Sequence, residues 1–318
     1  MTIRIIEVGD AMADGLLTDL QIKQRVAHVF KTTRFKRHMA DRAVIYALSL
    51  CALLVIFFLF NILAHLLTQG VSFLNLEFIT HLPKPVGEPG GGMANAIVGT
   101  LILLGIAVVV GVPIGLGAGI YLSEYAHKRF AYIVRFTTDV MNGIPSIVYG
   151  IFAYAVFVLP MKSFSAVSGG LALGIMMIPM ISRTSEQFIR MVPMSLREAG
   201  LALGVPKWKV IVDIILPISI GGIMTGIMAS LARVAGETAP LLFTAFGNHF
   251  WQSSLMHPIA ALPLQIFAYA ISPFDDWHRQ AWAGALLLIV LVFMINLLAH
   301  YFVLRQTRIF SGGGLNKR

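Results

Sequence analysis

Arginine and glutamate side chains stand inside long apolar runs of this sequence, where they could bind an anion. Arg233 and Glu237 lie near the end of the run 214–238, and Arg183 lies in the run 167–190. Charged groups at membrane depth usually face a cavity, and a guanidinium can bind an oxyanion through two parallel hydrogen bonds. The pattern therefore predicts an anion pathway through these residues. The alternative is that they anchor helices near the membrane surface, with Glu237 neutralising Arg233.

The two arginines are expected at different depths in the membrane. A helical rise of about 1.5 Å per residue places Arg233 in the outer third and Arg183 in the inner third. We therefore expect them to bind one anion in succession rather than together. Arg183, which Glu186 follows three residues later, is almost equally well explained as an anchor on the cytoplasmic side.

Patterns that would indicate an enzyme are weak. No Gly-Lys dipeptide occurs, which excludes a Walker A phosphate loop and ATP hydrolysis by that route. The nine histidines are scattered, with no pair at helical ligand spacing, so we expect no metal site. We therefore expect no catalytic residue, cofactor or metal in this chain. Because folding can bring distant serine, histidine and acidic residues together, an intramembrane enzyme remains an alternative of a different class.

The composition indicates that membrane helices position the charged residues. Of 318 residues, 57% are hydrophobic and 12% are charged, and the mean hydropathy is +0.81. A soluble domain carries about twice that share of charge. The sequence predicts an all-α, polytopic integral membrane protein with six transmembrane helices. Its apolar runs are each near the length of about 20 residues that a bilayer requires, and they cover 43–68, 94–122, 131–160, 167–190, 214–238 and 281–304.

The net charge of +9 reflects membrane orientation rather than nucleic-acid binding. Basic residues gather before the first run, between the second and third, between the fourth and fifth, and after the last. The loops on the other side hold only Lys84, Lys162 and Arg279. Because cytoplasmic loops are enriched in Lys and Arg, both termini are expected in the cytoplasm, and no nucleic-acid partner is expected. Cys51, the single cysteine, has no partner for a disulfide within the chain.

The chain divides into a transmembrane domain, 43–310, and two cytoplasmic ends. We expect the basic extension 1–42 to be a solvated, partly disordered tail rather than a surface helix, and 311–318 to be a short tail. Prolines interrupt the apolar residues between 239 and 280. We therefore expect an outer loop there, with a re-entrant or surface-lying helix instead of a seventh crossing.

Two further patterns concern helix packing and helix breaks. Gly111, Gly115 and Gly119 repeat every four positions on one face, which predicts close approach of another helix, although a lipid-facing helix rich in glycine is the alternative. Asn142 and Pro145 fall within the third apolar run, where the hydrogen-bond ladder must break. A kink that lines the pathway and a merely structural kink explain them equally well.

The loop between the fourth and fifth runs predicts a rigid elbow. Ser195 and Glu198 have capping-box spacing, so a helix should begin at Ser195. Gly204 is suited to the left-handed residue that ends a helix, and Pro206 to the first turn of the next. A helix, a tight turn and a second helix in a basic loop would offer a binding surface to another protein.

The elbow resembles the cytoplasmic signature of ABC importer permeases. That signature begins with Glu-Ala-Ala. Three residues separate this triplet from a Gly, and nine further residues separate the Gly from Ile-x-Leu-Pro. Glu198, Ala199 and Gly204 match, as does the stretch 214–217, whereas Gly200 replaces the third residue. The resemblance implies a type I ABC importer permease fold in which 195–213 is the coupling helix region. It implies that an ATP-binding subunit, which carries ATP and magnesium, is contacted at or near Glu198, Ala199, Gly200, Gly204, Lys207 and Trp208.

Within this family the chain resembles the permeases of phosphate importers over roughly residues 43–310. The resemblance rests on Ile-Pro-Ser-Ile-Val-Tyr-Gly at 144–150, Gly-Glu-Thr-Ala-Pro-Leu-Leu at 236–242, and the loop 83–92. It implies a bacterial inner-membrane permease in which Arg183, Arg233 and Glu237 serve phosphate passage. It further implies three partners: a companion permease in a heterodimer, a dimer of ATP-binding subunits, and an extracytoplasmic phosphate-binding protein. The residues alone indicate only an oxyanion, so sulfate, molybdate and phosphonate remain alternatives.

Overall fold

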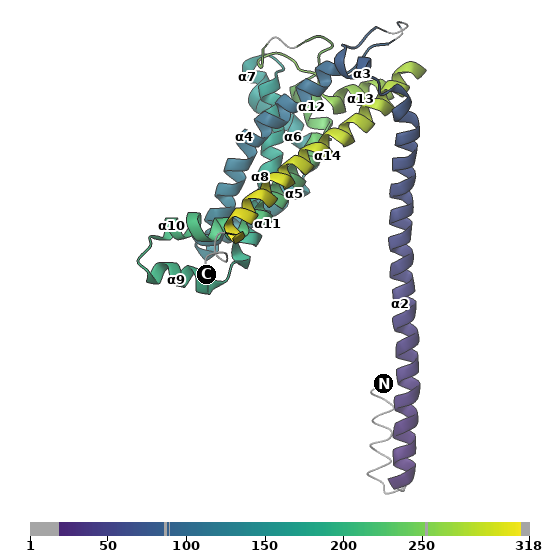
Figure 1. Ribbon diagram of the computed structural model, residues 1–318, viewed down its shortest axis with the longest axis vertical. Coiled ribbons are helices and arrows are strands. Elements are labelled where there is room, and N and C mark those ends of the chain that lie inside the picture. The colour runs from purple at the N-terminus through teal and green to yellow at the C-terminus, as the bar shows by residue number, and fades with distance from the viewer. Residues whose placement is uncertain (1–18, 86–87, 89, 252–253, 313–318) are drawn as a thin grey trace. The chain divides into compact units, whose positions relative to one another are not determined.

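The computed structural model describes residues 19–85, 88, 90–251 and 254–312 (Figure 1). Within these residues the chain is helical and contains no strand, only an isolated bridge between Phe246 and Ile259. The all-α prediction is confirmed. The helices, including one 3₁₀ turn (η1) and two π-helical turns (η2, η3), are α2 (Asp19–Gly70), η1 (Val71–Phe73), α3 (Leu76–Thr80), α4 (Ala94–Glu124), α5 (Lys128–Gly143), α6 (Ser146–Ala153), η2 (Tyr154–Val158), α7 (Leu159–Met161), α8 (Ala166–Met191), α9 (Met194–Ala202), α10 (Lys207–Val210), η3 (Ile211–Ile215), α11 (Leu216–Ala235), α12 (Ala239–Thr244), α13 (Leu262–Ala270) and α14 (Asp275–Gly312).

The first helix begins well before the first apolar run. α2 is continuous from Asp19 to Gly70, so the expectation of a disordered tail is wrong for residues 19–42. The reason is local: no proline or glycine interrupts the sequence between Asp19 and Gly70. Residues 1–18 lie outside the described residues, as do 313–318. By its contacts the chain divides into two units between His65 and Leu66.

In the described part of the chain, five helices are long and apolar enough to cross a membrane, and one bent pair of helices would make a sixth if it is counted as a single crossing. The five are Met39–Phe73, Ala94–Glu124, Ala166–Met191, Lys207–Ala235 and Asp275–Tyr301. The expected third span is a pair of helices, Arg129–Gly143 and Ser146–Met161, bent by 104°. The six-helix prediction therefore holds only if this pair is counted as one crossing. Pro145 causes the break, because it lacks an N–H and holds Ile144 in an extended conformation.

The second unit is built around the contact between α4 and α8. α11 packs on α8, and α14 packs on α11 and α13 (Figure 1). Gly111, Gly115 and Gly119 all lie on the face of α4 that meets α8. A Cβ atom added at Gly115 would lie 2.8 Å from Cβ of Ile181, and one at Gly119 would lie 2.6 Å from Cβ of Ser185. Any larger side chain at these two positions would therefore push the helices apart.

The region 239–280 contains two short helices, α12 and α13. α13 has nine residues, a length of about 14 Å, which is too short to cross a bilayer. Its Leu262, Leu264 and Tyr269 are buried, and it packs against α14. Figure 1 shows α3, α7 and α13 at one end of the second unit and α9 and α10 at the other. The elbow and the region 239–280 therefore lie at opposite ends of the helical bundle.

Candidate functional site

The elbow consists of α9, a turn at Gly204, and α10, which continues through η3 into α11. Gly204 has a φ of +78°, and its N–H donates to the carbonyl of Leu201 at 2.9 Å, so the predicted left-handed residue is confirmed. The predicted capping box is wrong. α9 begins at Met194 after the extended Pro193, no side chain caps it, and Ser195 lies inside the helix. Pro206 precedes α10 as its N-cap, rather than lying in the first turn.

Most of the predicted coupling residues are exposed on the elbow. Glu198, Ala199, Gly204 and Trp208 are exposed, and Trp208 exposes 62% of its surface. Gly200 is buried instead, because it faces η3 and α10: a Cβ there would lie 2.9 Å from Cγ2 of Val210. Leu203, which the sequence prediction missed, is 83% exposed beside the turn. The elbow thus presents large apolar side chains that could pack against another protein.

Arg197 connects the elbow to the rest of the bundle. Its Nη2 lies 2.9 Å from Oε1 of Glu124, at the end of α4, and the two side chains are only 12% and 6% exposed. The same guanidinium donates to the carbonyls of Ile189 and Val192 at the end of α8. Sequence reasoning missed this pair, although Arg197 directly precedes the Glu-Ala of the signature and Glu124 follows the run 94–122 by two residues. These contacts join α9 directly to the ends of α4 and α8.

Lys207 makes a second connection to the end of α4. Its Nζ donates to the backbone carbonyl of Glu124 and lies 4.5 Å from the centre of the Tyr125 ring. Its charged group is therefore already engaged within the chain. Of the six predicted coupling residues, Lys207 is thus the one whose side chain has a clear role inside this subunit.

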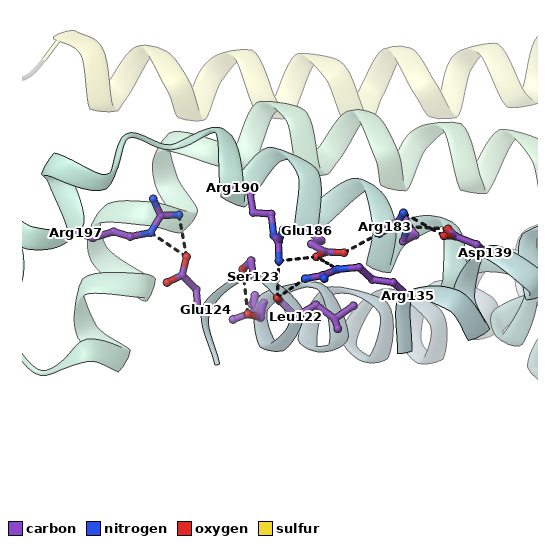
Figure 2. Close-up of polar contacts among 10 residues, drawn as sticks. Leu122, Ser123, Glu124, Arg135, Asp139, Arg183, Glu186, Arg190 and Arg197 are labelled. Carbon is purple, nitrogen blue, oxygen red and sulfur yellow. Dashed lines mark hydrogen bonds and ion pairs between the residues drawn. The ribbon is translucent and has the colours of Figure 1, made fainter. Parts of the chain in front are cut away.

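Glu186 is the centre of a cluster of arginines between α8, α5 and α4 (Figure 2). Its side chain is 2% exposed, and its oxygens lie 2.6 Å from Nε of Arg135, 3.0 Å from Nη1 of Arg183 and 3.1 Å from Nη2 of Arg190. Arg135 and Arg190 also donate to the carbonyl of Leu122 in the last turn of α4, each at 3.3 Å. A buried carboxylate is stable only with such partners. The cluster therefore holds three helices together at the end near the elbow.

Arg183 is bound by a second carboxylate, that of Asp139 on α5. Nε of Arg183 lies 2.8 Å from Oδ1 of Asp139, and Nη2 lies 3.2 Å from Oδ2. The sequence prediction selected Arg183 without Arg135, Asp139 or Arg190. The spacing of 183, 186 and 190 on one helix face was an available signal, since such positions are neighbours on a helix. The contribution of α5 could not be seen, because it depends on the fold.

Arg233 and Glu237 form a much looser pair. Nε of Arg233 lies 3.9 Å from Oε1 of Glu237, and the side chains are 47% and 18% exposed. α11 ends at Ala235, so Glu237 lies in the turn after the helix rather than within the expected span 214–238. Among the described residues, the Arg233 guanidinium has no hydrogen bond. Its donors are therefore available to an anion.

The structure does not bring Arg183 and Arg233 into one site. Arg183 lies eight residues, or about 12 Å, before the end of α8 at the elbow. Arg233 lies 17 residues, or about 26 Å, after the start of α11 at the elbow. The kink residues Asn142 and Pro145 lie at the break between α5 and α6. Among the described residues, no group of three His, Cys, Asp or Glu could hold a metal ion.

Comparison with known proteins identifies related chains over most of the length. Residues 111–308 match the model of the family described as binding-protein-dependent transport system inner membrane component. The phosphate transport system permease protein PstA of Yersinia pestis is 45% identical over 264 residues, which cover 83% of this chain and 90% of the relative. PstA of Xylella fastidiosa (strain Temecula1) is 41% identical and covers 88% of this chain and 96% of its own. A probable PstA of Methanocaldococcus jannaschii is 33% identical, with 81% and 92% covered.

Two solved transporters share the fold. The crystal structure of a bacterial alginate ABC transporter, in complex with an alginate pentasaccharide-bound periplasmic protein, aligns with a TM-score of 0.63 and 15% identity, covering 86% of this chain and 99% of its own. An inward-facing MetNI methionine ABC transporter aligns with a TM-score of 0.53 and 18% identity, covering 68% and 98%. At these identities the likeness concerns the fold alone. The predicted ABC importer permease fold is confirmed.

Proposed function

Because this chain belongs to the family of binding-protein-dependent transport system inner membrane components, we propose that it is the permease subunit of an ATP-driven importer of inorganic phosphate. The substrate is inferred from relatives named phosphate transport system permease proteins, two of which are 45% and 41% identical over most of this chain. The residues of the chain agree with an oxyanion, because arginine binds phosphate with two parallel hydrogen bonds.

The rigid elbow is the observation that supports ATP-driven transport. It places Leu203 and Trp208 on the surface while Arg197 and Lys207 hold its other side against α4. An ATP-binding partner that packs on the exposed side could therefore move α4 and α8 through these contacts. The permease would then alternate between two states by rigid-body motion, and ATP and magnesium would be bound by the partner. This chain would have no enzymatic activity of its own.

The anion would pass Arg233 before Arg183. Arg233 lies far from the elbow and has available donors, whereas Arg183 lies near the elbow within an ion-pair cluster. If the elbow is cytoplasmic, as the distribution of Lys and Arg predicts, this order is the order of import. Glu237 would keep the Arg233 side chain oriented without occupying its donors.

We further propose the partners and location that this function requires. A companion permease would form the other half of the pathway in a heterodimer. A dimer of ATP-binding subunits would contact the elbows, and an extracytoplasmic phosphate-binding protein would deliver the anion. The chain would span the bacterial inner membrane and contact its lipids, with both termini in the cytoplasm.

Uptake of radiolabelled phosphate by the importer complex, purified through this chain and reconstituted in proteoliposomes, tests the function. We expect ATP-dependent uptake that unlabelled phosphate abolishes and that excess sulfate or molybdate leaves nearly unchanged.

The variant Arg233→Gln should lower phosphate uptake at least tenfold, because each charge-assisted hydrogen bond lost is worth about 1.5–3 kcal/mol. Lys84→Gln, whose charge sits in a half-exposed pair with Glu77, should change uptake little. Strong competition by sulfate would contradict phosphate as the substrate, and uptake without an ATP-binding partner would contradict the coupling.

A further inference from the structure

The Asp139 carboxylate accepts hydrogen bonds from two N–H groups of Arg183, and an oxyanion bound to Arg183 would need the same two groups. Nε and Nη2 of this guanidinium point to the two oxygens of the Asp139 carboxylate, at 2.8 Å and 3.2 Å. This is the parallel geometry in which arginine binds a carboxylate or a phosphate. An oxyanion can therefore bind here only in exchange for Asp139.

The two carboxylates around Arg183 differ in how easily they can be displaced. Glu186 is on the same helix as Arg183, three residues away, and its side chain is 2% exposed and also held by Arg135 and Arg190. Asp139 is on α5, its side chain is 55% exposed, and in the described structure Arg183 is its one ion-pair partner. Asp139 can therefore rotate away from Arg183 while Glu186 stays in place. Because Arg135 keeps α5 bound to Glu186, this exchange requires no movement of the helix.

We propose that Asp139 is a positioning residue that competes with phosphate for Arg183 and so promotes its release near the elbow. The inference rests on the proposed function. Arriving phosphate displaces the carboxylate from Nε and Nη2, and Glu186 keeps the guanidinium oriented through Nη1. Return of the carboxylate, which repels the anion and restores the parallel pair, then expels the phosphate.

The contrast with Arg233 gives the two arginines different tasks. Glu237 remains 3.9 Å from Arg233 and makes no hydrogen bond to it, so this guanidinium can accept an anion without an exchange. At Arg183 the exchange makes binding weaker and release faster. A permease needs this order, because an anion held tightly at the last station would slow transport.

Binding and uptake measured with Asp139 variants test the proposal. The importer complex is purified through this chain, and equilibrium binding of radiolabelled phosphate is measured without ATP and without the binding protein. Asp139→Asn should bind phosphate about two- to fivefold more tightly, because a half-exposed pair of modest strength no longer competes. Its uptake per ATP hydrolysed should fall by a similar factor. Asp139→Glu, which keeps the carboxylate, should restore both values toward those of the original chain.

Two control variants separate this proposal from a structural role and from the proposed function. Glu77→Gln, which removes a carboxylate from the half-exposed pair with Lys84, should leave binding and uptake unchanged. In the double variant Arg183→Gln with Asp139→Asn, the gain in affinity should disappear. Unchanged or weaker phosphate binding by Asp139→Asn, or its failure to assemble, would overturn the proposal. If the original chain and Glu77→Gln neither bind nor import phosphate, the proposed function itself is wrong.

Discussion

The buried carboxylate of Glu186 is stable only because arginines surround it. Replacing it with glutamine would leave Arg135, Arg183 and Arg190 close together, with Asp139 as the remaining carboxylate of the cluster. Removing one partner of a buried ion pair lowers the free energy of unfolding by about 3–5 kcal/mol. We expect Glu186→Gln to lower the unfolding temperature of the purified complex clearly, as measured by a thermal melt. Glu77→Gln, which changes an exposed pair at 3.8 Å, should shift it little, and equal shifts would contradict the central role of Glu186.

Single residues could be selected from the sequence, but their partners could not. Arg183 stands out because a charge in an apolar run is rare. Asp139 and Arg135 do not stand out, because the sequence predicts that both lie within a single transmembrane span, 131–160, and gives them no partner. Their proximity to Arg183 arises only when Pro145 bends the third crossing and the glycines of α4 allow α8 to approach closely. Patterns in the sequence indicate how deep a residue lies in the membrane and how polar its segment is, whereas contacts between helices depend on the fold.

Gly204 determines the angle between α9 and α10. Its φ is +78°, and no other atom would lie within 4 Å of an added Cβ, so substitution there tests backbone strain alone. Gly204→Ala should disfavour the elbow by about 1–2 kcal/mol, because a left-handed conformation is costly for residues with a Cβ. Uptake per ATP hydrolysed should therefore fall severalfold. Gly221→Ala, where the space is also open and φ is negative, should have no such effect; a similar loss at both would contradict the role of the turn.

Helix positions were predicted better than helix ends. The apolar runs located the crossings because about 20 apolar residues are needed to span a bilayer. The predicted start of α9 differs from the observed start by one residue. Pro193 is the N-cap, so the helix begins at Met194 and Ser195 lies inside it. The helical conformation of residues 19–42 is not predicted from the sequence, because a polar, basic composition favours a disordered tail, although no proline or glycine breaks the stretch. Local breakers therefore decided these boundaries more than composition did.

Transport requires that work done at the elbow reaches both the pathway and the opposite end of the bundle. Arg197 lies where three helices meet: it belongs to α9 and binds Glu124 of α4 and two carbonyls at the end of α8. α8 carries the Arg183 cluster, and α4 is held to α8 by glycine contacts along its length. One side chain thus connects the surface proposed for the ATP-binding partner with the proposed release site.

Removing this connection should uncouple ATP hydrolysis from transport. We expect Arg197→Ala to lower uptake at least tenfold in proteoliposomes while the complex still hydrolyses ATP, because the exposed face of the elbow is retained. Lys209→Ala, an exposed basic residue of the same loop, should keep both activities. Loss of ATP hydrolysis together with uptake would instead indicate that Arg197 contacts the partner directly.

The same pair allows stability to be separated from coupling. Arg197→Ala leaves Glu124, which is 6% exposed, as an unpaired buried charge and should destabilise the complex by about 3–5 kcal/mol. Adding Glu124→Gln removes that charge, so the double variant should regain much of the thermal stability but none of the uptake. If uptake returned with stability, Arg197 would only hold the fold together. Continued loss of uptake in a stable double variant is the result expected if this ion pair transmits the motion.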